Sequence, residues 1–200
     1  MRFKTVLVFL GAAALRAISA PMSSYSALID RVLRAGDRLQ KLTPTDLLDR
    51  DLWRTVRDAP DAALTDDRAI GDAGMFALIR GGLLYALDDL DGAHPFFQDA
   101  PGDLGAYWHG MLHRREGDFD NARYWFRRAG VLPFFGALHG RAAEASADMA
   151  KQSSWDPWLF TGQCEQFRHG AEELRAELAA LQDAEFEVIF DYTWRQSRVG

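Results

Sequence analysis

The sequence predicts an all-α fold built from antiparallel helical hairpins, and three observations support this prediction. Apolar residues recur at three- and four-residue steps along most of the 200-residue chain, the spacing that places side chains on one face of a helix. Start and stop signals enclose a complete helical hairpin at residues 103–130. A shorter copy of the same pattern lies just upstream, at residues 74–101.

The better-formed hairpin consists of two predicted helices joined by a short polar turn. The first helix is expected around residues 107–115, and residues 116–118 supply its stop and the turn. In the second helix we expect Asp120 to be the N-cap and Gly130 the left-handed C-cap residue. The apolar positions that share one face of this second helix, and should be buried, are Ala122, Phe126 and Ala129.

The upstream hairpin repeats this pattern twenty-nine residues earlier. The aligned positions are Gly81, Asp89, Asp91, Ala93 and Phe97 in the first copy and Gly110, Asp118, Asp120, Ala122 and Phe126 in the second. Pro95 is confined to a first turn, and Pro101 with Gly102 ends the helix early, so the first copy is shorter. Because isolated repeats bury too little surface, the flanking helices must complete the core.

The second hairpin resembles a tetratricopeptide repeat, whose motif has a small residue in the first helix, a Gly-Asp turn, and Ala-x3-Phe in the second helix. The resemblance implies a right-handed stack of hairpins with flanking helices. It is local, because His109, His113 and Ala106 replace the leucine, tyrosine and tryptophan that the family prefers. The block YWHGMLHRREGDFDNARYWFRR also resembles an uncharacterised helical protein family, so the resemblance implies no particular activity.

The flanking segments show helical spacing with breaks between them. Before the hairpins we expect helices at 26–39 and from residue 45 to about 57, an acidic loop at 58–67, and a helix to about residue 87. After them we expect helices at 134–149 and 157–170, and a long closing helix from residue 174 onward. Residues 186–194 also alternate as a strand would, but helix is preferred because no partner strand is evident.

Length, composition and charge narrow the class of protein. With 48% hydrophobic residues, residues 22–200 are expected to form a single helical domain. The formal net charge of −6 argues against a nucleic-acid partner, since such proteins usually present a basic surface. The single cysteine, Cys164, rules out an intramolecular disulfide and a multi-cysteine zinc site.

The N-terminal segment 1–21 has two interpretations. Basic residues, an apolar run and small residues follow one another up to Ala20, as in a secretory signal, and the run is too short for a transmembrane span. Arg16 and Pro21 disfavour cleavage, and Met22 would begin the globular part if the segment is a start-site extension. We expect a cytoplasmic protein, with export as the alternative.

Histidines lie along one side of the predicted first helix of the second hairpin. His109, His113 and Glu116 occupy positions i, i+4 and i+7, so their side chains share one face. His94, in the preceding repeat, would add a third imidazole. Because a divalent metal such as zinc needs three or four convergent ligands, these four residues form a candidate metal site. The simpler alternative is that the histidines hydrogen-bond between packed helices.

The second hairpin is also locally basic and aromatic. Its arginines are Arg114, Arg115, Arg123, Arg127 and Arg128, and the interleaved aromatic residues are Tyr107, Trp108, Tyr124 and Trp125. Arginine can grip a carboxylate with two donors and stack on aromatic rings. The tetratricopeptide resemblance implies that the inner face of the first helix binds a peptide, at Tyr107, Met111, Arg114 and Arg115. The alternative is that these residues pair with nearby acids and pack in the core.

These patterns lead to two hypotheses about function. The first is a non-enzymatic helical-repeat binding or scaffold protein that recognises a protein, an acidic peptide or a small anion. The second is a metal-binding protein or metal-dependent enzyme that uses the histidines. No cofactor is expected, and a divalent metal is the alternative. Nucleotide binding has no support in the sequence, because no Gly-rich phosphate loop follows a strand. The sequence does not determine the oligomeric state.

Overall fold

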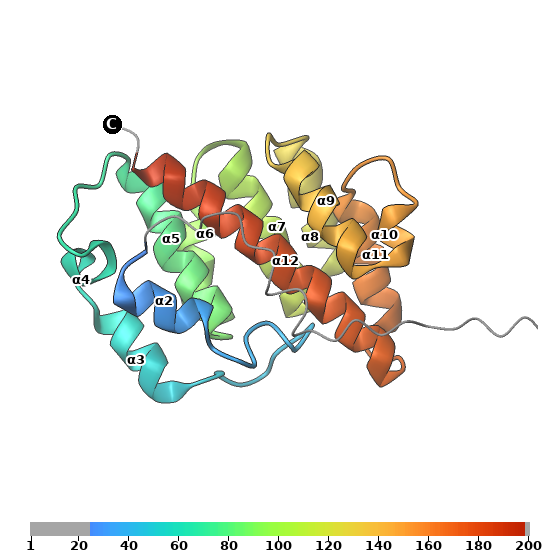
Figure 1. The fold of residues 1–200 in the computed structure, drawn as a ribbon, viewed down its shortest axis with the longest axis horizontal. Coiled ribbons are helices and arrows are strands. Elements are labelled where there is room, and N and C mark those ends of the chain that lie inside the picture. The colour runs from blue at the N-terminus through green and yellow to red at the C-terminus, as the bar shows by residue number, and fades with distance from the viewer. Residues whose placement is uncertain (1–24, 199–200) are drawn as a thin grey trace, which may run out of the picture.

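The computed structural model describes residues 25–198, and every regular element within them is a helix. Figure 1 shows the longest helix, α12, lying across the others. The helices are α2 (Ala27–Leu33), α3 (Arg50–Asp58), α4 (Asp61–Thr65), α5 (Ala73–Ala86), α6 (Leu90–Gln98), α7 (Gly102–Glu116), α8 (Phe119–Ala129), α9 (Phe135–Ala145), α10 (Ala147–Ala150), α11 (Pro157–Phe167) and α12 (Glu172–Ser197). The predicted all-α fold is confirmed for this part of the chain.

Two expectations concern membranes and export. Within residues 25–198, no helix combines the length and apolar character needed to cross a membrane. The segment 1–21, with its two interpretations, lies outside the described residues and stays a prediction.

The two predicted hairpins are α5–α6 and α7–α8. Inside each of them, a glycine of the first helix packs closely against a phenylalanine of the second helix. A Cβ on Gly81 would lie 2.7 Å from a ring carbon of Phe97, and a Cβ on Gly110 would lie 2.8 Å from the ring of Phe126. Since neither position has room for a Cβ, glycine is needed for the second helix to pack this closely on the first. The contact supports the alignment of the two copies. Right-handed tetratricopeptide stacking stays an expectation of the resemblance.

The helix α8 begins two residues earlier than predicted. The carboxylate of Asp118 accepts a hydrogen bond from the backbone N–H of Asn121 at 3.2 Å, which makes Asp118 the N-cap. The prediction that Asp120 caps α8 is wrong, because Asp118 already satisfies the free amide and Asp120 lies in the first turn. Asp89 caps α6 in the same way, so Pro95 lies inside α6, and the prediction that confined it to a first turn is wrong. As predicted, Gly117 ends α7, with a left-handed φ of 83°.

Residues 186–194 belong to α12, so the helix prediction is confirmed and the strand alternative is wrong. Phe186, Ile189 and Phe190 are all buried, and helical spacing places them on one face. Phe186 packs against the rings of Tyr85 on α5 and Trp108 on α7, at centroid distances of 6.0 Å in both cases. This face of α12 therefore closes the core over both hairpins.

Several flanking segments differ from the prediction. The helix expected from residue 45 begins at Arg50, because the carboxylate of Asp49 accepts the first free amides and so caps it. The expected helix at 26–39 stops at Leu33, whose carbonyl accepts a hydrogen bond from the guanidinium of Arg38 at 2.5 Å instead of continuing the helix. The acidic segment 58–67, expected as a loop, contains the short helix α4. The expected helix at 134–149 is divided into α9 and α10, because Ser146 adopts an extended conformation and caps α10.

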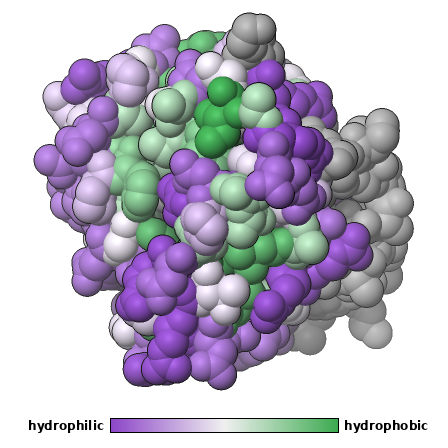
Figure 2. All heavy atoms as spheres, turned by 90° about the vertical axis from the view of Figure 1, so that its left-hand side faces the viewer, coloured by the Kyte–Doolittle hydropathy of each residue, from purple (hydrophilic) through white to green (hydrophobic). Residues whose placement is uncertain are grey.

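A pocket of about 220 Å³ lies where α3, α4, α5 and α6 meet. Figure 2 shows this end of the molecule, where hydrophobic residues gather in the middle of the face and hydrophilic residues surround them. Two arginines line the pocket, but Arg57 pairs with Asp58 and Arg80 pairs with Asp61. Asp89 also lines the pocket, so the lining carries charged groups of both signs.

The helix α7 is buried on all sides, so its polar side chains need partners inside the protein. The guanidinium of Arg114 pairs with the carboxylate of Glu185 on α12, and both side chains are buried. The hydroxyl of Tyr107 donates to Glu185 at 2.8 Å and accepts from the indole of Trp155 at 2.7 Å. The neighbouring Arg115 pairs with Asp88, the two charged groups lying 2.5 Å apart. These contacts join α7 to α12 and to the start of α6.

Replacing one member of the Arg114–Glu185 pair should destabilise the protein strongly. Arg114→Met leaves a buried carboxylate without its cation, and Glu185→Leu leaves a buried cation, so each should cost about 3–5 kcal/mol. The double variant should be more stable than either single variant, because no buried charge remains unpaired. Urea unfolding at neutral pH measures all four proteins. If each single variant loses less than about 1 kcal/mol of unfolding free energy, as expected for an exposed ion pair, the pair does not behave as a buried one.

Candidate metal centre

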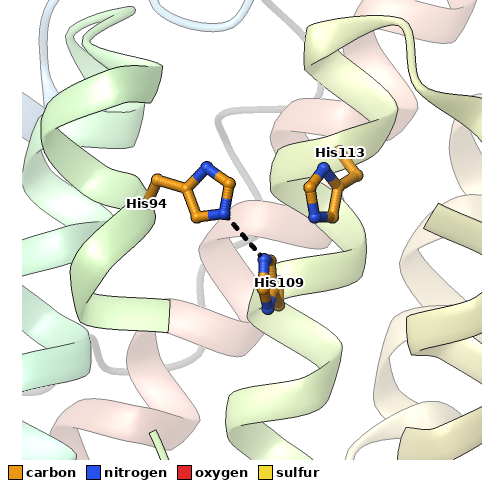
Figure 3. A group of neighbouring side chains, drawn as sticks. All are labelled: His94, His109 and His113. Carbon is orange, nitrogen blue, oxygen red and sulfur yellow. Dashed lines mark hydrogen bonds between the residues drawn. The ribbon is translucent and has the colours of Figure 1, made fainter. Parts of the chain in front are cut away.

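Three histidines from two helices converge in the core of the molecule. His94 lies on α6, and His109 and His113 lie one turn apart on α7 (Figure 3). One nitrogen atom from each ring can be chosen so that all three atoms lie within 4.8 Å of one another. The Nε2 atoms of His94 and His109 are 3.0 Å apart. The sequence therefore identified three side chains that the structure brings together.

The packing of α7 explains why its histidines face α6. With 3.6 residues per turn, His109 and His113 are rotated by roughly 100–160° around α7 from Tyr107 and Arg114, so they face a different neighbour. Since Tyr107 and Arg114 are hydrogen-bonded to Glu185 on α12, the histidines turn away from α12. There they meet His94, which the short connection between α6 and α7 brings back alongside them.

Glu116 lies behind two of the rings. Its carboxylate is 2.7 Å from Nδ1 of His113 and 3.4 Å from Nδ1 of His94. This differs from the predicted role of Glu116 as a fourth ligand, because its oxygens face the Nδ1 atoms. A carboxylate that accepts the Nδ1–H of an imidazole fixes the tautomer that has a lone pair on Nε2. Glu116 therefore favours the tautomer of His94 and His113 in which Nε2 carries the lone pair.

Asn121 is a site residue that the sequence did not reveal. Its side-chain amide donates to Nε2 of His113 at 3.1 Å, across the α7–α8 hairpin. Binding of a metal ion by this nitrogen requires the amide to turn away. The sequence could indicate Asn121 as a site residue only if the start of α8 were known. Because Asp118 caps α8, Asn121 lies in its first turn.

Aromatic stacking holds His109 in place. Its ring stacks on His113 at a centroid distance of 4.5 Å and on Trp125 of α8 at 4.1 Å. His109 as a whole residue is 2% exposed, whereas the side chains of His94 and Glu116 are 31% and 25% exposed. The cluster therefore has a buried side at His109 and a side open to solvent at His94 and Glu116.

The electrostatics of the site favour a neutral His109 and an ionised Glu116. Burial lowers the pKa of His109 to about 4, and the neighbouring His113 and His94 contribute in the same direction. The hydrogen bond from His113 lowers the pKa of Glu116 below its ordinary value. His109 is therefore neutral at neutral pH, the charge state that a metal ligand would need.

The residues fit a metal ion that takes three nitrogen ligands. In a tetrahedral zinc site with Zn–N bonds of about 2.0–2.1 Å, ligand nitrogens lie roughly 3.3 Å apart. The 3.0 Å between Nε2 of His94 and Nε2 of His109 is close to this value, but these two atoms share a hydrogen bond whose proton a metal ion would have to displace. The chosen nitrogens lie up to 4.8 Å apart, so at least one ring would have to move for all three to bind one ion. Ligation through Nε2 of His109 would place the ring proton on Nδ1, which is buried and has no hydrogen-bond partner among the described residues. Three imidazoles would leave a fourth position for water or another ligand.

The four residues predicted to bind a peptide do not form an accessible surface. They are Tyr107, Met111, Arg114 and Arg115, and all four are buried. The arginines pair with Glu185 and Asp88, as the alternative of internal pairing proposed. The resemblance-based placement of a peptide at these residues is therefore corrected, because α6, α8 and α12 cover the faces of α7 that would have to be open.

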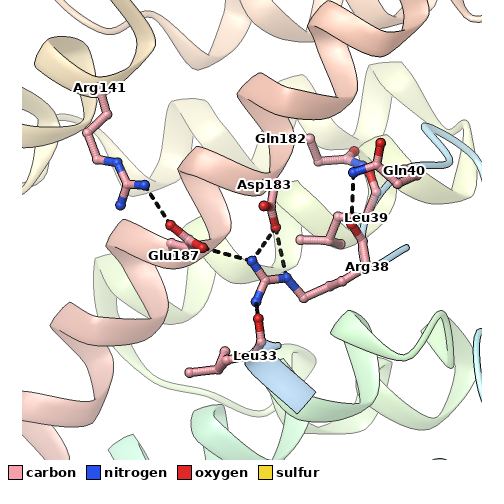
Figure 4. Close-up of polar contacts among 8 residues, drawn as sticks. All are labelled: Leu33, Arg38, Leu39, Gln40, Arg141, Gln182, Asp183 and Glu187. Atoms are coloured by element: carbon pink, nitrogen blue, oxygen red, sulfur yellow. Dashed lines mark hydrogen bonds and ion pairs between the residues drawn. The ribbon is translucent and has the colours of Figure 1, made fainter. Parts of the chain in front are cut away.

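A second polar cluster joins residues 33–41, at and after the end of α2, to α12 (Figure 4). The guanidinium of Arg38 binds the carbonyl of Leu33 and the carboxylates of Asp183 and Glu187, and Glu187 also pairs with Arg141. The amide of Gln182 donates to the carbonyls of Leu39 and Lys41. Because each charged group in it has a partner, we interpret this cluster as a structural link.

Comparisons with known proteins add no functional information. No protein-family model matches the chain, and comparisons with curated proteins and with solved structures likewise find no match. The two resemblances noted in the sequence therefore stay expectations.

The stability of the metal-free protein should depend on pH through His109. The groups that face this ring are His94, His113, Glu116 and Arg128. The pKa of His109 falls from 6.5 to about 4 on folding, so between these pH values the unfolded chain holds a proton that the folded chain does not. The free energy of unfolding should therefore fall as the pH falls from 6.5 to 4, by about 1.4 kcal/mol per pKa unit of difference.

Urea unfolding at several pH values, in the presence of a chelator, measures this dependence. His109→Phe should reduce the slope between pH 6.5 and 4, because that proton-binding group is gone. His169→Gln, at an exposed position on another helix end, is the matched control and should leave the slope unchanged. Equal slopes for His109→Phe and the unmodified protein would show that His109 does not have a depressed pKa.

Proposed function

We propose that this protein binds a divalent transition-metal ion through His94, His109 and His113. The observation that carries the proposal is the convergence of three imidazoles from α6 and α7, within 4.8 Å of one another. Imidazole is a preferred ligand of zinc and of other late first-row metals, whereas magnesium and calcium prefer oxygen. The donor set therefore favours a metal such as Zn²⁺ or Co²⁺.

Each residue has a distinct part in the proposed site. His109 is the buried ligand, held between His113 and Trp125. His94 is the partly exposed ligand, on the side from which an ion would enter. Glu116 orients His94 and His113 through their Nδ1 atoms. The proposal concerns binding rather than catalysis, because the carboxylate nearest the rings is used to hold them.

Isothermal titration of untagged, chelator-treated protein with Zn²⁺ tests the proposal. We expect one ion per chain, and Co²⁺ should bind at the same site with the visible absorption of a tetrahedral complex. Glu116→Gln should weaken binding by about 10- to 100-fold, the range known for residues that orient metal ligands. His94→Ala should weaken it further, because a ligand itself is lost.

Two comparisons distinguish this site from adventitious binding. His169→Ala removes an exposed histidine outside the cluster and should bind Zn²⁺ as the unmodified protein does. His94→Ala changes a partly exposed side chain, so its fold can be checked by circular dichroism. If the unmodified protein binds no stoichiometric metal, or if His94→Ala and His169→Ala bind equally well, the proposal fails and the histidines are hydrogen-bonding residues between packed helices.

A further inference from the structure

We propose that α8 and the first turn of α11 form a docking surface for an acidic, unstructured peptide segment of a partner protein. Among residues 25–198, the large hydrophobic side chains that are exposed lie on these two helices or directly after α8. They are Tyr124, Val131, Trp158 and Leu159, with exposed fractions from 42% to 86%. This concentration of exposed apolar side chains is typical of an interaction site.

The two helices are joined at this surface by Trp158. Its indole N–H donates to the backbone carbonyl of Arg123 on α8 at 3.1 Å. The guanidinium carbon of Arg127, also on α8, lies 5.0 Å from the centre of the Trp158 ring. Trp158 is therefore fixed in position while part of its ring stays exposed. A fixed, partly exposed aromatic ring supplies contact area at little cost in side-chain entropy.

Two arginines on this face are available to bind an anion. Arg127 lies over Trp158, and Arg128 lies over Trp125 at 5.0 Å from the ring centre. Both side chains are exposed, and neither forms an ion pair with any residue that the structure describes. By contrast, Arg123 on the same helix pairs with two carboxylates. A guanidinium stacked on a ring keeps its N–H edge free, and that edge can bind a carboxylate with two hydrogen bonds.

The charge on this face indicates which partner it fits. Arg127 and Arg128 lie in the last turn of α8, where the helix end itself carries negative partial charge, so an anion must be held by the two side chains. An acidic peptide would place carboxylates on the guanidiniums and apolar side chains on Tyr124 and Leu159. A lipid surface fits less well, because Trp158 is bonded to α8 and covered by Arg127, and so is not free to insert.

Fluorescence anisotropy with a labelled synthetic peptide rich in glutamate, aspartate and leucine tests this proposal. We expect saturable binding at low ionic strength that weakens as salt is added. The same peptide with glutamine and asparagine in place of its acids should not bind. Anionic phospholipid vesicles, examined by co-sedimentation, should recover little protein.

Matched variants locate the binding site. Arg127→Gln with Arg128→Gln should weaken peptide binding by about tenfold or more, because charge-assisted hydrogen bonds are lost. Arg127→Lys with Arg128→Lys keeps the charge but removes the planar guanidinium groups that can donate two parallel hydrogen bonds, and should also weaken binding. Arg31→Gln with Arg34→Gln is the control, since it removes equal charge from exposed positions on α2 that no tryptophan supports. That control should bind as the unmodified protein does.

Three outcomes would overturn the proposal. They are an absence of peptide binding, equal weakening by the control at positions 31 and 34, and binding to anionic vesicles in place of the peptide. His94→Ala should keep full peptide binding, because the arginines do not depend on a metal ion. The docking surface and the metal site can therefore fail independently.

Discussion

The buried ion pair between Arg114 and Glu185 is the constraint on which the rest of the structure depends. Both side chains are removed from water, and the cost of removing two charges from water is offset only when they pair closely and their remaining hydrogen bonds are made. The hydroxyl of Tyr107 donates to the carboxylate, and the indole of Trp155 donates to that hydroxyl, whereas the Nε of Arg114 has no hydrogen-bond partner among the described residues. This network fixes the orientation of α7 about its own axis relative to α12, because any other orientation would leave buried charges without partners.

That rotation determines the candidate site. With Tyr107 and Arg114 directed toward α12, His109 and His113 are directed toward α6 and meet His94. The α7–α8 hairpin adds Trp125, which stacks on His109 and is itself covered by Arg128. His109 and Arg128 are thus the inner and outer ends of one column of stacked groups, with Trp125 between them. The proposed metal site and docking surface are therefore neighbours on the same hairpin.

The sequence could predict features that depend on local spacing, and it missed those that depend on distant partners. The hairpins, the turn at Gly117 and the common face of His109 and His113 all follow from residues a few positions apart. The partner of Arg114 lies 71 residues away on α12, so no local pattern reveals it. The same limit applies to the peptide-binding prediction, because burial of α7 depends on a helix at the far end of the chain.

The central claim is that three imidazoles of this cluster bind one metal ion. X-ray absorption fine structure of the protein loaded with one equivalent of Zn²⁺ tests it directly, because scattering from imidazole rings counts the histidine ligands. The account predicts three imidazole nitrogens at about 2.0–2.1 Å and a fourth light-atom ligand. A zinc shell made of oxygen ligands, or one containing fewer than two imidazoles, would contradict it.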